Sequence, residues 1–402
     1  MKLLAINQYY PPDIASTGLY MAEICANLAQ RGFCVHVVTG QPSYTSSSPK
    51  ALPFEVLNGV HVHRVSLGNA CGRERMRVRV EGYLRFLVGA WLKAKYLAKK
   101  RHFDAVITFH NPPFIGLIGA YLASRFGMRF VFVWYDIYPD ALIVAGWRLP
   151  QVIVKVWELL NQWILSKADR VIVLGDRVKL NLVERKKVPS KKIRVIPIWA
   201  YPELAPQPKD YHIRKELGIN NNDLMLLYSG NMGIMHPLDP ILDAAVSLRN
   251  LPIRFVFVGD GIQRKHLISR VESENLKNVL FLPFQPQQRF VQLVASSDAC
   301  FVSFKPGMEN VTVPSRAFTF ISAGRPLITI MSHEADVARL IIEKGCGWNV
   351  TTGHELRELI ISFLSNPVEL QRRGQIAREV YDKYFNREVI IEKYARVIVG
   401  DE

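Results

Sequence analysis

The 402-residue sequence has little cysteine, no long apolar run and fewer acidic than basic residues. Its five cysteines are scattered and form no C-x-x-C pair, so neither a disulfide framework nor a zinc site is indicated. Such cysteine usage fits a reducing, cytosolic compartment. Because no run of 18 or more apolar residues occurs, no membrane-spanning helix is predicted. The first ten residues, MKLLAINQYY, have too short an apolar run for a signal peptide and read as a first strand.

Lysine and arginine outnumber aspartate and glutamate by 51 to 35, which gives a formal net charge of +16. Such a charge suits a polyanion, a phosphorylated ligand or an anionic membrane, although a basic surface also serves solubility alone. Hydrophobic residues make up 49% of the chain, which is enough for large cores. The length predicts two domains of roughly 200 residues each.

Short apolar strands alternate with helices along most of the chain, which predicts parallel sheets covered on both faces. In the first half, strands are expected at 3–7, 34–40, 104–109, 129–136 and 169–175, with helices at 19–32, 114–125 and 151–167. In the second half, strands are expected at 224–230, 253–259, 279–284, 299–304 and 326–330. The fold class is therefore α/β, with two tandem doubly wound, Rossmann-like domains.

The domain boundaries are predicted from breaks in this alternation. Residues 1–198 form the first domain, and the proline-rich segment 199–212 has no helical period and reads as a linker. Residues 213–376 form the second domain. The final stretch, 377–402, has a long helical pattern after the second domain is complete.

Three helix starts in the second domain follow strand ends, where ligands of such sheets bind. Gly230 and Gly233 in YSGNMG leave room for backbone N–H groups to approach a phosphate. Arg264 lies just after VGDG and can reach a phosphate from there. Taken singly, each is equally compatible with a plain strand–helix turn or a surface arginine.

The third start is VTVPSRAFTFISAGRP, residues 311–326. Ser315 is predicted to cap a helix over 316–323, with Arg316 beside its N-terminus, where anions bind. Gly324 suits the left-handed position that ends a helix. Three such starts in one domain favour a phosphate-bearing ligand.

The motifs YSGNMG, VGDG, LPFQPQQ, SSDACFVSF and VPSRAFTFISAGRPLI occur in the order seen in glycosyltransferase family 4. In the first half, YYPPDIASTG, FVWYDIYPDAL and ADRVIVLGDRVK also resemble this family, especially bacterial polysaccharide and O-antigen sugar transferases. The resemblance implies a GT-B fold and a C-terminal domain that binds most of the UDP- or GDP-sugar donor. It also implies retention of anomeric configuration, no required metal or cofactor, and a terminal helix that crosses back to the first domain.

Donor-site roles follow from this resemblance position by position. Gly230, Asn231 and Gly233 match the turn beside the donor diphosphate. Many members have a cation in this turn, whereas here the loop offers Asn231 and His236. The missing charge is therefore expected from Arg264 and Arg316, with the base held near Phe284.

Thr319 is the clearest departure from the family pattern. Many members carry two glutamates seven residues apart, of which the second, five residues before the glycine, accepts hydrogen bonds from the ribose hydroxyls. Here that position is Thr319, whose hydroxyl cannot accept as a bidentate carboxylate does. Glu309 is the nearest upstream acid, in a different register.

In the first domain, the resemblance assigns candidate catalytic roles to His110 and Asp136, both at strand ends. His110 also fits an ordinary loop histidine, and Asp136 a turn aspartate. Tyr10 and Gly18, in and after the first loop, are expected to face the acceptor or a phosphate through the N-terminus of the first helix.

The segment 72–102 carries ten lysines or arginines and two glutamates. From Tyr83 on, its apolar residues keep helical spacing. The helix is predicted either to lie on an anionic membrane or to pack its apolar face in the core. If the segment binds a membrane, Arg73, Arg75, Arg77 and Arg79 are expected to contact it. A polyprenyl-diphosphate-linked acceptor at the inner face of the membrane would explain such membrane association.

Together these patterns predict a hexosyl- or N-acetylhexosaminyl-type glycosyltransferase acting in cell-surface polysaccharide synthesis. A GT-B-type nucleotide-sugar epimerase is the alternative enzyme, and it would need carboxylates placed for proton transfer. A nucleic-acid-binding protein is suggested by charge alone, because the sequence contains no recognition motif.

Overall fold

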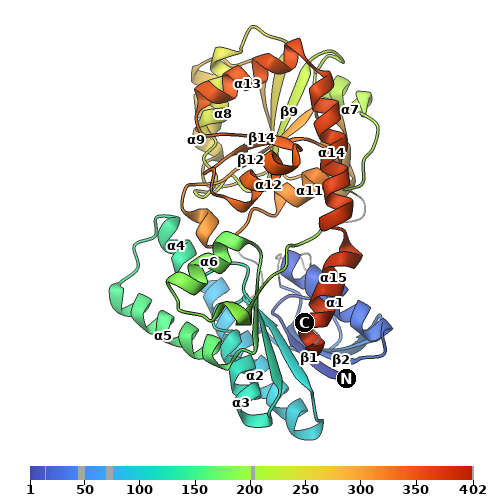
Figure 1. Cartoon of the computed structure of the whole chain (residues 1–402), viewed down its shortest axis with the longest axis vertical. Coiled ribbons are helices and arrows are strands. Elements are labelled where there is room, and N and C mark those ends of the chain that lie inside the picture. Colours follow the sequence, from blue (N-terminus) through green and yellow to red (C-terminus); the bar gives the residue numbers. More distant parts are fainter. Residues whose placement is uncertain (14, 44–49, 69–75, 201–203, 401–402) are drawn as a thin grey trace. The chain divides into compact units, whose positions relative to one another are not determined.

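The computed structural model describes residues 1–13, 15–43, 50–68, 76–200 and 204–400, which form two compact units (Figure 1). Unit 1 contains Met1–Ile143, Trp147–Ile196 and the chain from Ile391 on. Unit 2 contains Val144–Gly146 and Pro197–Ile390. Each unit has one sheet with helices on both faces, so the predicted pair of doubly wound α/β domains is confirmed.

Unit 1 is built on an eight-stranded sheet in the order β3-β4-β2-β1-β5-β6-β7-β8. Neighbouring strands are parallel except for the β3–β4 hairpin. The strands are β1 (Lys2–Ile6), β2 (Cys34–Gly40), β3 (Phe54–Leu57), β4 (Val60–Val65), β5 (Ala105–Phe109), β6 (Arg129–Val133), β7 (Arg170–Val173) and β8 (Ile193–Val195). The central strands are buried along nearly their whole length, as expected of a sheet covered on both faces.

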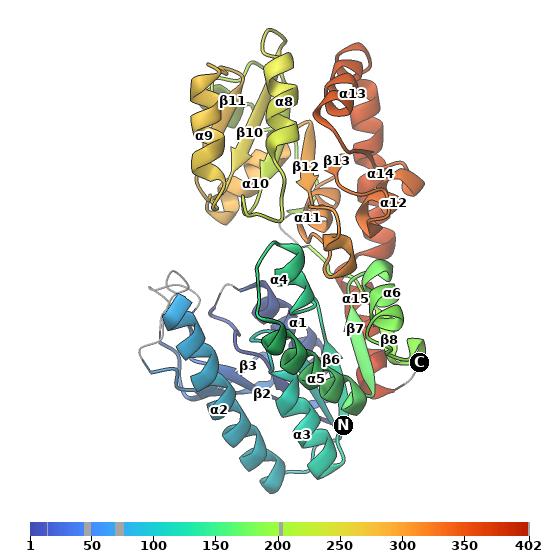
Figure 2. The same ribbon diagram turned by 90° about the vertical axis from the view of Figure 1, so that its left-hand side faces the viewer.

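The helices of unit 1 are α1 (Ser16–Gln30), α2 (Met76–Lys100), α3 (Gly116–Phe126), α4 (Asp140–Val144), α5 (Gln151–Lys167) and α6 (Asp176–Glu184), with a 3-10 turn η1 (Ser190–Lys192). α3 contacts both α2 and α5, and these three helices lie side by side against the sheet (Figure 2). None of the helices in the described part of the chain is long and apolar enough to cross a membrane.

Unit 2 is built on a six-stranded, all-parallel sheet in the order β11-β10-β9-β12-β13-β14. The strands are β9 (Leu224–Ser229), β10 (Ile253–Val258), β11 (Val279–Leu282), β12 (Ala299–Ser303), β13 (Leu327–Ile330) and β14 (Gly347–Val350). Its helices are α7 (Tyr211–Glu216), α8 (Asp239–Ser247), α9 (Arg264–Ser273), α10 (Gln287–Ser296), α11 (Arg316–Ser322), α12 (Asp336–Lys344), α13 (Gly353–Ser365) and α14 (Val368–Tyr384), with a 3-10 turn η3 (Met308–Asn310).

The strand order reverses direction once in each sheet, between β1 and β5 in unit 1 and between β9 and β12 in unit 2. At such a switch point the loops leaving the two central strands diverge, and the crevice outside their carboxyl ends is where doubly wound sheets bind ligands. The topology therefore directs the search for a site to the loops after these four strands.

The C-terminal segment differs from the single helix expected over 377–402. It consists of α14 and α15 (Arg387–Val399), separated at Phe385 and Asn386. Phe385 packs on Phe318 with 4.9 Å between ring centroids, which fixes the end of α14. The Asn386 side chain accepts a hydrogen bond from the Glu388 amide and so supports the start of α15. In unit 1, α15 is fixed by a 2.7 Å hydrogen bond between the Tyr394 and Tyr135 hydroxyls.

Candidate functional site

A pocket of about 280 Å³ lies at the switch point of unit 1. The loops after β1, β5 and β6 form most of it, together with the first residues of α1 and a part of α2. Its lining includes both predicted catalytic residues, His110 and Asp136. The other lining residues are Tyr9, Ala15, Ser16, Thr17, Arg79, Tyr83, Asn111, Pro113, Tyr138, Leu142 and Trp157.

His110 and Asp136 are directly paired, because Nε2 of the imidazole lies 2.9 Å from Oδ2 of the carboxylate. The imidazole is buried, whereas the Asp136 side chain is 37% exposed toward solvent. Nδ1 of His110 is also buried and has no hydrogen-bond partner within the described chain. The pair therefore presents a carboxylate that a hydroxyl group can approach, beside an imidazole that this carboxylate orients.

Gly18 explains how α1 comes to line this pocket. A Cβ atom at this position would lie 2.8 Å from the Tyr9 carbonyl carbon, so glycine allows the helix to pack on the backbone of the first loop. This packing puts Ser16 and Thr17, in the first turn of α1, at the pocket wall. Tyr10 instead points into the core, where burial raises its pKa, and it does not line the pocket.

The four arginines predicted to contact a membrane fall in different places. Arg73 and Arg75 lie outside the described residues. Arg77 is exposed at the start of α2, whereas Arg79 is half-buried and lines the pocket of unit 1. Arg79 is therefore a pocket cation in this structure, because its position on α2 turns it toward the loops rather than toward the outer face.

At the switch point of unit 2, two glycine turns pack backbone against backbone. A Cβ atom on Gly259 would lie 2.0 Å from the Gly230 carbonyl oxygen, and one on Gly261 would lie 2.5 Å from the Met232 backbone. Between the turns, the Met232 amide donates to the Asp260 carbonyl at 2.8 Å. Only glycine permits this approach, so the YSGNMG and VGDG motifs form one structural unit.

Arg316 lies beside the packed pair of glycine turns. A Cβ atom on Gly230 would be 3.8 Å from its Nε, and its guanidinium stands 5.1 Å from the centre of the Phe290 ring. Arg264 begins α9, and its Nε is buried with no hydrogen-bond partner among the described residues. Two cations thus flank the paired glycine turns at the carboxyl edge of the sheet.

His236 does not act as a third cation. Its Nδ1 donates to the Ser303 carbonyl at 2.7 Å, and its ring stacks on Phe304. Burial lowers the pKa of His236 despite this hydrogen bond, so the ring is neutral at pH 7. It joins the loop after β9 to the end of β12. The Asn231 side chain is exposed, while the Asn231 carbonyl accepts from the Tyr228 hydroxyl at 2.8 Å.

The helix start at Ser315 differs from the prediction. α11 does begin at Arg316, and Gly324 has the expected positive φ of 66°. However, Ser315 has helical backbone angles and its hydroxyl makes no capping hydrogen bond, so the predicted side-chain cap is wrong. Thr319 is half-buried one turn along this helix, Glu309 lies in η3, and Phe284 is 61% exposed after β11.

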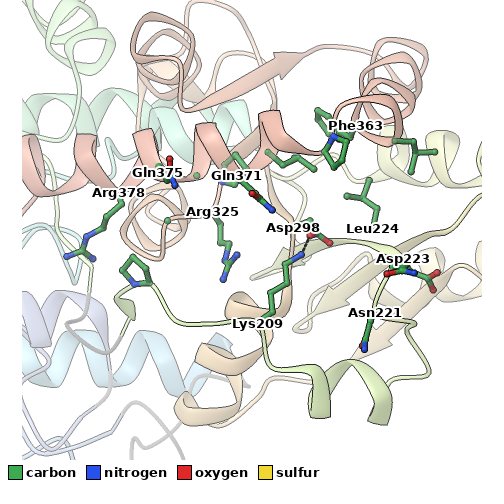
Figure 3. A pocket seen from close by; sticks show the side chains of 18 of the residues that line it. Lys209, Asn221, Asp223, Leu224, Asp298, Arg325, Phe363, Gln371, Gln375 and Arg378 are labelled. Atoms are coloured by element: carbon green, nitrogen blue, oxygen red, sulfur yellow. Dashed lines mark hydrogen bonds and ion pairs between the residues drawn. The ribbon is translucent and has the colours of Figure 1, made fainter.

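A larger hollow of about 750 Å³ lies at the opposite, amino-terminal edge of the same sheet (Figure 3). It is lined by residues that precede strands, such as Asp298 before β12, and by the α14 side chains Gln371, Gln375 and Arg378. None of the predicted donor residues lines it. Its cations are already neutralised in part, because Lys209 pairs with Asp298 and Arg378 with Asp382. The carboxyl edge therefore remains the candidate donor site.

One group of metal-ligating side chains lies elsewhere in unit 1. Cys34 and His36 of β2 and His61 of β4 each offer a ligand atom, and these atoms lie within 4.8 Å of one another. The sequence prediction missed this group. Its signal was a C-x-H and an H-x-H pattern on two strands, whose meeting depends on strand register.

Two family matches cover most of the chain. Residues 17–199 match the family described as the glycosyl transferase 4-like domain, and residues 210–380 match the family described as glycosyl transferases group 1.

Two curated relatives align over the full chain. A probable glycosyltransferase of Pseudomonas aeruginosa, WbjE, is 22% identical over 99% of this chain and 97% of its own. A putative colanic acid biosynthesis glycosyl transferase of Escherichia coli K12, WcaI, is 23% identical over 100% of both chains.

Solved structures share the fold at low sequence identity. Sucrose-phosphate synthase of Thermosynechococcus elongatus has a TM-score of 0.76 and 18% identity, covering 100% of this chain and 98% of its own. HepE of Anabaena, solved in complex with UDP and glucose, has a TM-score of 0.71 and 16% identity over 100% of both chains.

Proposed function

This chain belongs to the glycosyltransferases of the GT-B fold, and we propose that it moves a sugar from a UDP- or GDP-sugar to a lipid-linked glycan. The reaction would proceed with retention of configuration and serve cell-surface polysaccharide synthesis. The colanic acid role in the name of WcaI supports the pathway, and the UDP complex of HepE supports a nucleotide-sugar donor. A GT-B epimerase is not favoured by these relatives.

The observation that carries the proposal is the pair of packed glycine turns flanked by Arg264 and Arg316 in unit 2. The donor diphosphate would lie over the turn from Gly230 to Gly233, where backbone amides and the two guanidinium groups meet it. As the bond between sugar and phosphate breaks, negative charge grows on the diphosphate, and these donors stabilise it. The ribose would approach α11 near Thr319, and the base the exposed ring of Phe284.

We assign the pocket of unit 1 to the acceptor. Arg79 and the first turn of α1 at Ser16 and Thr17 suit the diphosphate of a polyprenyl-linked glycan, because both favour an anion. The Asp136 carboxylate, oriented by His110, would accept a hydrogen bond from the attacking hydroxyl. The leaving phosphate would then take the proton on the face that the acceptor attacks, so no covalent nucleophile is required.

Exposed apolar stripes on α2 and α5 support a membrane-bound acceptor. On α2 the stripe recurs at every fourth residue and is 46–60% exposed, comprising Val80, Leu84, Val88, Leu92 and Tyr96. On α5 it comprises Val152, Val156, Leu159 and Trp163. Small or aromatic residues such as Ala90, Ala94 and Phe86 form the core-facing side of α2. Since the exposed stripe is flanked by cations such as Arg77 and Lys99, α2 fits an anionic membrane surface.

The reaction is tested by incubating the purified protein with a panel of UDP- and GDP-sugars, with and without lipid extracted from bacterial membranes. We expect nucleotide release that requires the lipid, and a product whose anomeric configuration, read by NMR, matches that of the donor. Asp136→Asn should lower kcat/KM for the acceptor about 10- to 100-fold and leave the Kd for UDP unchanged. Asp104→Asn, at the opposite edge of the same sheet, is the control.

Three outcomes would contradict the proposal. Isomerisation of the free nucleotide-sugar without lipid would favour the epimerase. An inverted product would exclude retention, and equal effects of Asp136→Asn and Asp104→Asn would remove Asp136 from the site.

A further inference from the structure

The strands β2 and β4 bring together four side chains that the transfer reaction does not use. These strands are parallel neighbours, and His36 is aligned with His61 in their register. Because residues two apart on a strand point to the same face, Cys34 shares a face with His36, and His63 shares it with His61. Cys34, His36 and His61 lie toward the amino ends of their strands, away from the carboxyl edge where the His110 pocket lies, and His63 follows near the middle of β4.

The contacts within this group leave one buried ring nitrogen unused. His36 is only 2% exposed, and its Nδ1 lies 3.0 Å from Nε2 of His63. Its other ring nitrogen, Nε2, is buried and has no hydrogen-bond partner in the part of the chain that the structure describes. The His36 and His61 rings stack with 4.6 Å between their centres. One nitrogen held by a neighbour and the other left for a ligand is the arrangement of a metal-binding histidine.

We propose that Cys34, His36 and His61 bind a zinc-type divalent metal ion, with His63 as a positioning residue that hydrogen-bonds to His36. Thiolate sulfur and imidazole nitrogen are the ligands that Zn²⁺ prefers, and a water molecule completes a tetrahedral site. Bonds of about 2.0–2.3 Å require ligand atoms roughly 3.5 Å apart. The three ligand atoms lie within 4.8 Å of one another, so shifts of about 1 Å in the side-chain positions would bring them to this spacing.

The surroundings of the group suit this role. Cys34 and His61 are half-buried, so an ion can enter from solvent. Because β4 is also one strand of the β3–β4 hairpin, the ion would link that hairpin to β2 and so stabilise its place in the sheet.

The test uses the full-length protein with its purification tag removed, stripped with a chelator and titrated with Co²⁺ alone. We expect one Co²⁺ per chain, with a thiolate-to-cobalt absorption band and intense visible bands typical of tetrahedral cobalt, both displaced by Zn²⁺. Cys34→Ser should abolish the thiolate band. His61→Gln should weaken Co²⁺ binding at least about tenfold, and His63→Gln should weaken it about 10- to 100-fold while keeping the thiolate band.

His266→Gln, which removes an exposed histidine of unit 2, is the matched control and should bind Co²⁺ as the wild type does. Thermal unfolding gives a second readout, since Zn²⁺ should raise the Tm of the wild type and of His266→Gln but not that of His61→Gln. Cys34 and His61 are half-buried, so these variants are expected to fold even if changes at His36 are not tolerated. Wild-type titrations without a thiolate band, or identical to those of His61→Gln, would overturn the proposal.

Discussion

At the scale of single residues, Arg316 is the side chain on which the proposed donor site depends most. It stands against Phe290 and beside the Gly230 turn. We predict that Arg316→Ala weakens UDP or GDP binding about 10- to 100-fold, because a hydrogen bond to a charged group is worth about 1.5–3 kcal/mol. Isothermal titration calorimetry measures this change. Arg249→Ala, which removes an exposed arginine of the same unit, is the control, and equal Kd values for both variants would exclude Arg316 from phosphate binding.

His236 leads to a pH prediction. Burial lowers its pKa in the folded protein below the 6.5 of an unperturbed histidine. Below about pH 6.5 the unfolded chain therefore binds a proton that the folded chain does not, so His236 makes the free energy of unfolding fall as the pH drops. His236→Asn keeps a donor for the Ser303 carbonyl but cannot titrate. Urea unfolding at pH 7.5 and 5.5 should show a smaller loss of stability in the variant, and equal losses would refute the assignment.

At the scale of elements, the two glycine turns of unit 2 make a prediction about stability. Gly259→Ala should lower the free energy of unfolding by about 1–3 kcal/mol or more, since the new Cβ would meet the Gly230 carbonyl oxygen. Gly127→Ala is a matched control, because Gly127 also has a positive φ but its Cβ would meet no atom within 4 Å. Denaturant unfolding separates the clash from the cost of the backbone conformation. If both variants lose the same stability, the contact between the turns contributes nothing.

The exposed stripe of α2 yields a second prediction at this scale. Replacing Leu84 and Leu92 together by Asn should weaken binding to vesicles that contain anionic lipid at least about tenfold, because burying one leucine is worth about 1.5–3 kcal/mol. A flotation assay measures the bound fraction. The control replaces Ile342 and Val368, two exposed apolar residues of unit 2, by Asn. Equal binding of the two double variants would argue against α2 as the membrane contact.

Much of the fold was readable from the sequence, because buried parallel strands are continuous apolar runs. The β3–β4 hairpin was missed, although Asn58 and Gly59 between its strands have the positive φ values of a tight turn and carry its usual Asn-Gly signal. The break at Phe385 could not be read, since it depends on Phe318, which is remote in sequence.

The candidate site was readable where the backbone itself demands a residue type, as at Gly230 and Gly259. It was not readable where the partner is a distant backbone group. His236 is still predicted to help bind the donor, but its hydrogen bond to the distant Ser303 carbonyl could not be read from the sequence. Likewise Arg79 was assigned to a membrane from its charge, while its place in the pocket follows from how α2 packs. The group formed by Cys34, His36 and His61 could not be predicted without knowing the register in which β2 and β4 pair.

At the scale of the whole molecule, the proposed donor site belongs to one unit, and this can be measured by calorimetry. Bound UDP at a hundredfold its Kd should stabilise the unit that holds it by about 2.7 kcal/mol. We predict that UDP raises the temperature of a transition of unit 2 more than that of unit 1. At the same UDP concentration, Arg316→Ala should reduce this stabilisation to about 0.4–1.4 kcal/mol, because its Kd is 10- to 100-fold higher. An unchanged shift in this variant would mean that the nucleotide binds elsewhere.

The return of α15 to unit 1 has a consequence for how the protein is made. Tyr394 and Ile398 are fully buried, and Tyr394 bonds to Tyr135 from the far end of the chain. Domains usually fold in the order in which the ribosome releases them. Here unit 1 emerges before unit 2 but lacks part of its core until α15 has left the ribosome. Unit 2 can therefore complete its fold before unit 1 does, although unit 1 is synthesised first.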